Sequence, residues 1–156
     1  MKGTHMTKKF YEQHLRTFSK LISWRLVMIM TQTVAGYLTT GSATIGLQIA
    51  IILAVINTII FWLHDRLWNI STWGRIKDTK KEFNEKYSRT IVKSITWRIL
   101  MIIVITSVAY IRTGNITTAI LFMSTAAILA ILAYWFHERI WNMIRWGKKS
   151  SYGAKV

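Results

Sequence analysis

The apolar residues of the chain gather in four blocks, at positions 26–38, 44–63, 99–111 and 116–136. An apolar helix of about 20 residues spans the hydrocarbon layer of a bilayer, which is about 30 Å thick. The second and fourth blocks reach that length. The first and third reach it when the residues before them are included, with Arg25 and Arg98 extending to the headgroups. The pattern therefore predicts four membrane-spanning helices.

A soluble helical bundle with unusually apolar helices is the competing interpretation. Surface helices of a soluble bundle show a polar face along their whole length. Neither long block has such a face, and residues 44–63 carry no charge at all. We therefore favour the membrane interpretation.

The two halves of the chain repeat each other at a shift of 73 residues. Residues 16–74 align with residues 89–147 without a gap, and 21 of the positions are identical. Such a repeat predicts two copies of one helical hairpin in the same orientation, related by a pseudo-twofold axis along the membrane normal. The predicted fold class is all-α, an integral membrane four-helix bundle with amphipathic cytoplasmic helical extensions.

The repeat divides the chain into five segments, which are an arm at 1–15, a hairpin at 16–74, a linker at 75–88, a second hairpin at 89–147 and a tail at 148–156. Residues 7–20 are expected to form an amphipathic helix on the membrane surface. The mixed charges of the linker indicate a solvated helix that continues into the third span. Gly41 and Gly114 predict tight turns between the two helices of each hairpin.

The positive charge lies almost entirely on one side of the predicted spans. The net charge is +15, and of 21 Lys and Arg residues only Arg112 lies on the side of the turns. Short loops rich in Lys and Arg stay in the cytoplasm, so we expect a multi-pass protein of the cell membrane with both termini cytoplasmic. A charge of +15 can also indicate nucleic acid. With four spans, a basic collar on anionic lipid headgroups is the simpler interpretation, and we expect no nucleic-acid partner.

The candidate site consists of residues that recur in both halves at the basic ends of the spans. They are Lys20, Trp24, Arg25, His64, Asp65, Arg66, Trp68, Lys93, Trp97, Arg98, His137, Glu138, Arg139 and Trp141. An Arg at this depth needs a carboxylate, a carbonyl or a lipid phosphate. Because Asp65 and Glu138 are the only acids close to the spans, we predict an Arg25–Asp65 and an Arg98–Glu138 clamp, one within each hairpin. We assign these clamps a structural role in preference to substrate binding.

A metal site is the alternative interpretation of the same residues. A pseudo-twofold bundle could bring His64 and His137 together, with Asp65 and Glu138 nearby, and such a set would suit a divalent metal. Hydrogen bonds to Arg25 or Arg98, with Trp rings anchoring the depth of the helices, are the simpler interpretation. We therefore expect no metal and no cofactor.

Catalysis is not expected from this chain. No ionisable residue lies in the middle of any predicted span, where proton and ion pathways usually place one. The sequence also has no phosphate-binding loop, no nucleophile elbow and no cysteine. We expect neither catalytic nor cofactor-binding residues.

The recurring motifs resemble a known family. The order Arg-Thr-x-x-Lys-x-x-x-Trp-Arg, a span, Thr-Gly, a second span and His-Glu-Arg-x-Trp is similar to the small membrane domain of unknown function 2061. The second repeat matches over residues 89–146 and the first over 16–73, with Asp65 in place of the usual Glu. The resemblance implies the topology described above and no activity.

The chain departs from this family within the second span of each repeat. Family members usually carry an acid and a Lys before the aromatic pair, whereas Ala54 and Asn57, or Ala127 and Ala130, stand there in this chain. The departure implies that the tandem protein has lost any polar site within its spans.

Two classes of function are compatible with these features. The first is an accessory or structural subunit that packs within a larger membrane complex, for example a membrane oxidoreductase of the archaeal ammonia monooxygenase type. The second is a small transporter or channel that acts as a homo-oligomer. A regulator that binds a metal or anionic lipid is a minor alternative, in which Lys80, Lys81, Lys148 and Lys149 would contact the lipid.

Overall fold

The computed structural model describes residues 7–12, 14–77 and 83–153. Its long elements are four helices, namely α1 (His14–Thr40), α2 (Ala43–Ile70), α3 (Tyr87–Thr113) and α4 (Ile116–Met143). Each helix is long and apolar enough to cross a membrane. The predicted all-α membrane fold of four spans is therefore confirmed.

Two tight turns join the helices of each hairpin, as predicted. Gly41 and Gly114 have φ values of 73° and 68°, a left-handed conformation that favours glycine. The next residue caps the following helix in both cases. The Ser42 side chain accepts from the Ile45 N–H, and the Asn115 side chain accepts from the Thr118 N–H. A single helix–turn–helix design therefore occurs twice.

Four short strands replace the predicted helical extensions. β1 (Thr7–Glu12) pairs antiparallel with β4 (Lys148–Gly153), and β2 (Arg75–Lys77) pairs antiparallel with β3 (Phe83–Glu85). The amphipathic helix expected over 7–20 is thus wrong up to residue 12, and the helical linker expected over 75–88 is wrong where the structure describes it. Pairing with a second segment overrides helical charge spacing here, because a backbone ladder satisfies the polar groups of both segments.

The strands follow the same repeat as the helices. Glu12 lies opposite Lys148 in one ladder, and Glu85 lies opposite Arg75 in the other. These two pairs are related by the 73-residue shift. The structural unit therefore extends beyond the hairpins on both sides.

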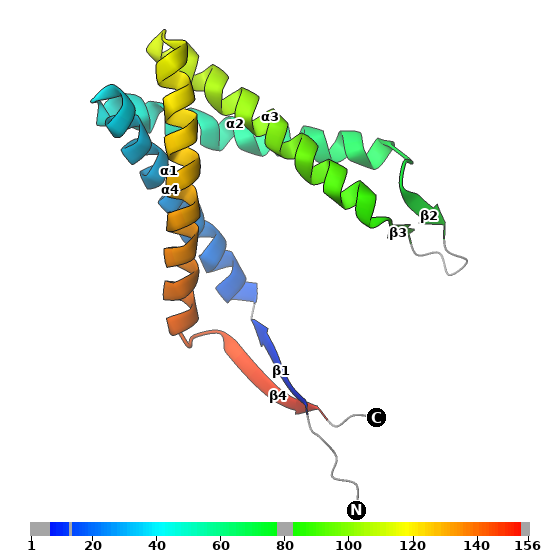
Figure 1. Ribbon diagram of the computed structural model, residues 1–156. Helices are drawn as coiled ribbons and strands as arrows, with labels where there is room; N and C mark the ends of the chain where they lie inside the picture. The colour runs from blue at the N-terminus through cyan, green and yellow to red at the C-terminus, as the bar shows by residue number, and fades with distance from the viewer. Residues whose placement is uncertain (1–6, 13, 78–82, 154–156) are drawn as a thin grey trace, which may run out of the picture.

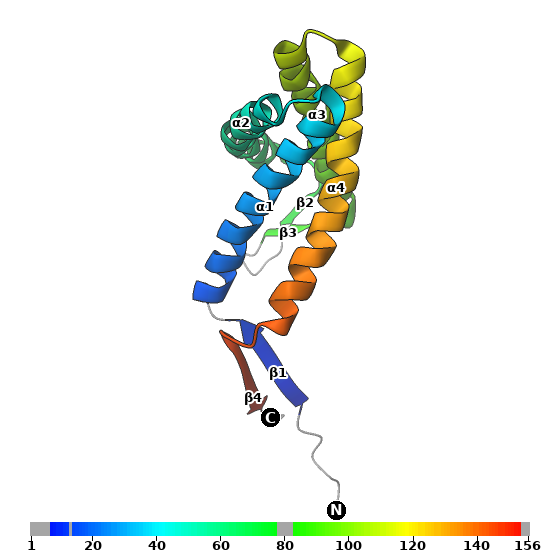
Figure 2. The ribbon, with the colours of Figure 1, turned by 90° about the vertical axis from the view of Figure 1, so that its left-hand side faces the viewer.

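The helices form two legs that diverge from a common end. α1 and α4 run together to the β1–β4 ladder, and α2 and α3 run together to the β2–β3 ladder (Figures 1 and 2). We call the first pair with its ladder the terminal leg and the second pair with its ladder the middle leg. The end that carries both turns is called the turn end, and the ends that carry the ladders are called the basic ends.

The common core lies close to the turn end. Its buried members are Ala35, Ile49, Leu53, Val108, Ala109, Ala119, Phe122 and Ala126. Every one of them lies within twelve residues of Gly41 or Gly114. Small residues let the helices of each hairpin approach here, Gly36 against Gly46 in the first and Ala109 with Ala119 in the second. The helices therefore share a core only over the half nearest the turns.

Candidate functional site

A fully buried arginine joins the two helices at the basic end of the terminal leg. Arg16, on α1, donates to the carbonyl oxygens of Trp141 at 2.5 Å, Ile144 at 2.9 Å and Trp146 at 2.6 Å. The guanidinium also lies 5.2 Å from the centre of the Trp141 ring. The last carbonyls of a helix lack partners within the helix and carry partial negative charge. Arg16 of the first repeat therefore caps α4 of the second.

The middle leg contains the same arrangement with the repeats exchanged. Arg89, on α3, donates to the carbonyl oxygens of Trp68, Ser71 and Trp73. It also forms an ion pair with Glu85, 3.1 Å from Nε to Oε1. Arg89 of the second repeat thus caps α2 of the first. Each repeat closes the helix end of the other.

A glycine makes room for each of these arginines. Gly74 and Gly147 both have a φ of 72°. A Cβ atom at Gly147 would lie 2.7 Å from the Cβ of Arg16, and one at Gly74 would lie 2.9 Å from the Cβ of Arg89. The Trp-Gly pair that ends each repeat therefore combines a left-handed backbone with close packing against the arginine.

An ion pair lies beside each arginine, across the same two helices. Lys20 Nζ is 2.8 Å from Glu138 in the terminal leg, and Lys93 Nζ is 2.6 Å from Asp65 Oδ1 in the middle leg. The four side chains are between 26% and 41% exposed. Pairs this exposed contribute about 0–1 kcal/mol, so they orient the helices more than they stabilise them.

These pairs correct the predicted clamps within each hairpin. Arg25 does not pair with Asp65, nor Arg98 with Glu138; the acids pair with lysines of the other repeat. The reason lies in distance from the turn. Arg25 is 16 residues from Gly41 but Asp65 is 24, and at 1.5 Å per residue the two differ in depth by about 12 Å.

A hydrogen-bonded group of three side chains completes the terminal leg. The Trp141 indole N–H lies 2.9 Å from Ser23 Oγ and 3.1 Å from His137 Nε2. The Ser23 hydroxyl is itself 2.8 Å from His137 Nε2. Trp24 packs against the same imidazole, with ring centres 5.4 Å apart. Both His137 and Trp141 are buried, so the group fixes the face that α4 turns toward α1.

The middle leg repeats this group with Thr96 in place of Ser23. The Trp68 indole N–H lies 3.2 Å from His64 Nε2 and 3.3 Å from Thr96 Oγ1, and Trp97 packs on His64 at 5.4 Å. His64 and His137 therefore lie in different legs, and the shared metal site proposed for them with Asp65 and Glu138 is not formed. An indole N–H only donates, so the Nε2 atom of each ring is already used as an acceptor. The described residues contain no cluster of three metal-ligating side chains.

The remaining arginines of the predicted site lie at the surface. Arg66 and Arg139 stack on the Trp one turn earlier, 5.5 Å from the Trp62 ring and 5.6 Å from the Trp135 ring. Arg98 is also exposed, and it lines a cleft of about 530 Å³ between α1, α3 and α4. These residues do not contact the buried groups described above.

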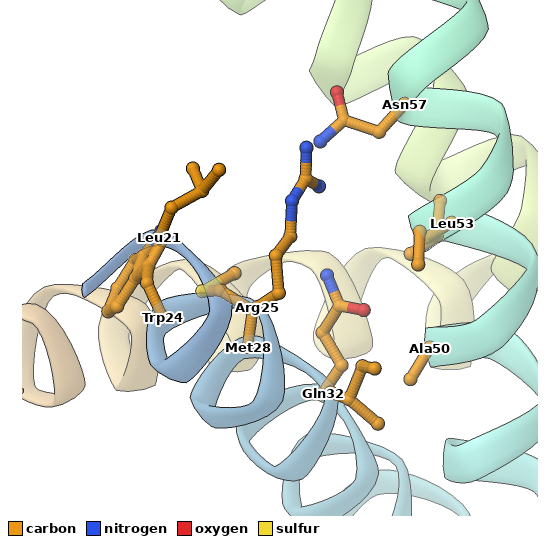
Figure 3. Close-up of a pocket in the computed structure, with 10 residues that line it drawn as sticks. Leu21, Trp24, Arg25, Met28, Gln32, Ala50, Leu53 and Asn57 are labelled. Carbon is orange, nitrogen blue, oxygen red and sulfur yellow. The ribbon is translucent and has the colours of Figure 1, made fainter. Parts of the chain in front are cut away.

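A second cleft, of about 250 Å³, lies between α1 and α2 on the basic side of the core. Its polar side chains are Arg25 and Gln32 from α1 and Asn57 from α2 (Figure 3). In Figure 3 the Arg25 guanidinium extends across the cleft toward the Asn57 amide. The inference that the spans have lost every polar site is therefore wrong, because Asn57 faces an arginine of the neighbouring helix.

Sequence reasoning missed the buried arginines as site residues, together with Gly74 and Gly147. All four are identical between the repeats, and that identity was the available signal. The pairing of each arginine with the opposite repeat was not visible, because the shift of 73 residues is the same whether the helices pair within or between repeats.

The fold and its buried groups define an integral membrane protein built from a tandem repeat. A family model described as a predicted membrane protein, DUF2061, matches residues 18–69 and again residues 91–142. The chain belongs to this family and carries two copies of its domain. Neither a curated protein nor a solved structure matches the chain.

Proposed function

We propose that the protein is a non-catalytic accessory subunit whose helices pack against transmembrane segments of other chains. The observation that carries this proposal is the short common core. Beyond twelve residues from the turns, the legs separate and no longer bury side chains in common. A four-helix bundle that served only to fold would be expected to close along its length, since membrane helices associate through packing.

The legs are held apart by specific contacts rather than left loose. Arg16 and Arg89 each fix one helix end of the other repeat, so α1 stays with α4 and α2 with α3 at the basic ends. A helix pair fixed in this way offers its outer and inner faces to neighbours. Exposed apolar side chains on these faces, such as Met30 and Ile131, suit lipid or a further transmembrane helix.

We further propose that the basic ends lie on the cytoplasmic side of the cell membrane. The distribution of Lys and Arg supports this orientation. A membrane oxidoreductase or a transporter is the kind of assembly that we propose as the partner, and we assign no enzymatic activity to the chain itself.

Extraction of the tagged protein in mild detergent tests this proposal. Size-exclusion chromatography and mass spectrometry should recover the protein with the same membrane proteins in a fixed ratio. Recovery as a lone monomer or homo-oligomer that conducts ions or solutes in liposomes would refute the subunit role and favour the transporter alternative.

A further inference from the structure

The cleft between α1 and α2 contains a cation for which the protein supplies no partner. Among the described residues, none forms an ion pair or hydrogen bond with Arg25, and no carboxylate lines the cleft. The acids nearest the spans, Asp65 and Glu138, are already paired with lysines. An arginine at the edge of the hydrocarbon layer without an anionic partner is costly.

The other polar groups of the cleft are amides placed to assist in binding an anion. Asn57 and Arg25 each lie 16 residues from Gly41, so the two helices carry them at the same depth, about 24 Å from the turn. The Asn57 amide nitrogen is turned toward the guanidinium, and its Oδ1 atom is buried with no hydrogen-bond partner in the described part of the chain. Two donor groups that face each other leave a place for a shared acceptor.

We infer that this cleft binds the phosphate of an anionic phospholipid. The depth of Arg25 in a layer about 30 Å thick puts its guanidinium close to the lipid phosphates. The remaining walls are apolar, formed among others by Leu21, Met28 and Leu53, and these suit acyl chains. Basic pockets between transmembrane helices are known to hold anionic lipid headgroups. A free phosphate ion would not require such walls.

The second repeat offers a natural comparison. Arg98 occupies the position equivalent to Arg25, but Ile105 and Ala130 replace Gln32 and Asn57. The Arg98 side chain therefore lacks the two amides that could share an anion with it. We expect the tighter site to be the one at Arg25.

Native mass spectrometry of the full chain in detergent, titrated with dioleoyl phosphatidylglycerol, tests the inference. We expect one tightly held lipid per chain. Arg25→Ala should weaken binding tenfold or more, Asn57→Leu should weaken it less, and Arg66→Ala should leave it unchanged. Arg25 has no protein partner to lose, so Arg25→Ala should fold normally, which thermal unfolding without added lipid would verify.

Two further arms identify the source of the phosphate. Dioleoyl phosphatidylcholine should bind more weakly, because its choline offsets the phosphate charge, and inorganic phosphate or glycerol 3-phosphate should not compete at equal concentration. Equal protection by these soluble anions would overturn the lipid assignment. Unchanged phosphatidylglycerol binding by Arg25→Ala would overturn the site itself. These outcomes are independent of the subunit role, because they concern the isolated chain and not its co-purification with other proteins.

Discussion

Replacing Arg89 with alanine removes the side chain that joins α3 to the end of α2. Arg89 is 1% exposed and donates to three backbone carbonyls. A hydrogen bond from a charged donor contributes about 1.5–3 kcal/mol. Water can reach the carbonyls of Ser71 and Trp73 and replace part of two of these bonds, so we use the lower value and reduce the sum to about 3 kcal/mol. The unfolding equilibrium should then change by more than about a hundredfold.

Unfolding in mixed micelles with increasing SDS, followed by tryptophan fluorescence, measures this loss. Arg66→Ala is the matched control, because it removes the same charge from an exposed stack on Trp62 and should change stability by no more than about 1 kcal/mol. Arg89→Lys should fall between the two, since a lysine keeps the charge but not the planar fork of donors. If Arg89→Ala and Arg66→Ala unfold at the same SDS fraction, the capping role is refuted.

Two other substitutions test the close approaches that the glycines permit. Gly147→Ala should destabilise by about 2 kcal/mol or more, since it strains the backbone and meets Arg16; Gly41→Ala, with the same backbone sign but open space around it, should lose only about 1 kcal/mol, and equal losses would contradict the packing argument. Gly36→Ala would place a Cβ 2.2 Å from the Cα of Gly46 and should separate α1 from α2, at about 3 kcal/mol; Ala109→Gly, the equivalent position, should lose about 1 kcal/mol, and a Gly36→Ala variant as stable as the wild type would show that the helices can adjust.

The spans and turns could be predicted from the sequence because each depends on local properties. An uncharged run such as residues 44–63 can be recognised without knowing its neighbours, and Gly41 marks a turn through its own backbone preference. The strands could not be predicted in the same way. β1 exists because β4, more than 130 residues later, lies beside it, and the charge spacing of the linker resembled that of a helix.

The candidate site was predicted in its residues but not in its pairing. Lys20, His64 and Glu138 were correctly selected from the repeat, yet Arg25 was paired with Asp65 because both are polar groups near one mouth of a hairpin. Counting residues from Gly41 would have excluded that pair by depth. The choice of the opposite repeat depends on how the legs diverge, which is a tertiary property that no single segment specifies.

Cross-linking of introduced cysteines tests the pairing between repeats most directly. The chain has no cysteine of its own, and a protease site placed at 78–82 would cut it into its two halves. A disulfide between Lys20→Cys and Glu138→Cys should keep the halves joined after cleavage under non-reducing conditions, whereas Lys20→Cys with Asp65→Cys should form none. Rapid cross-linking of the second pair, with separation of the halves in the first, would contradict the account.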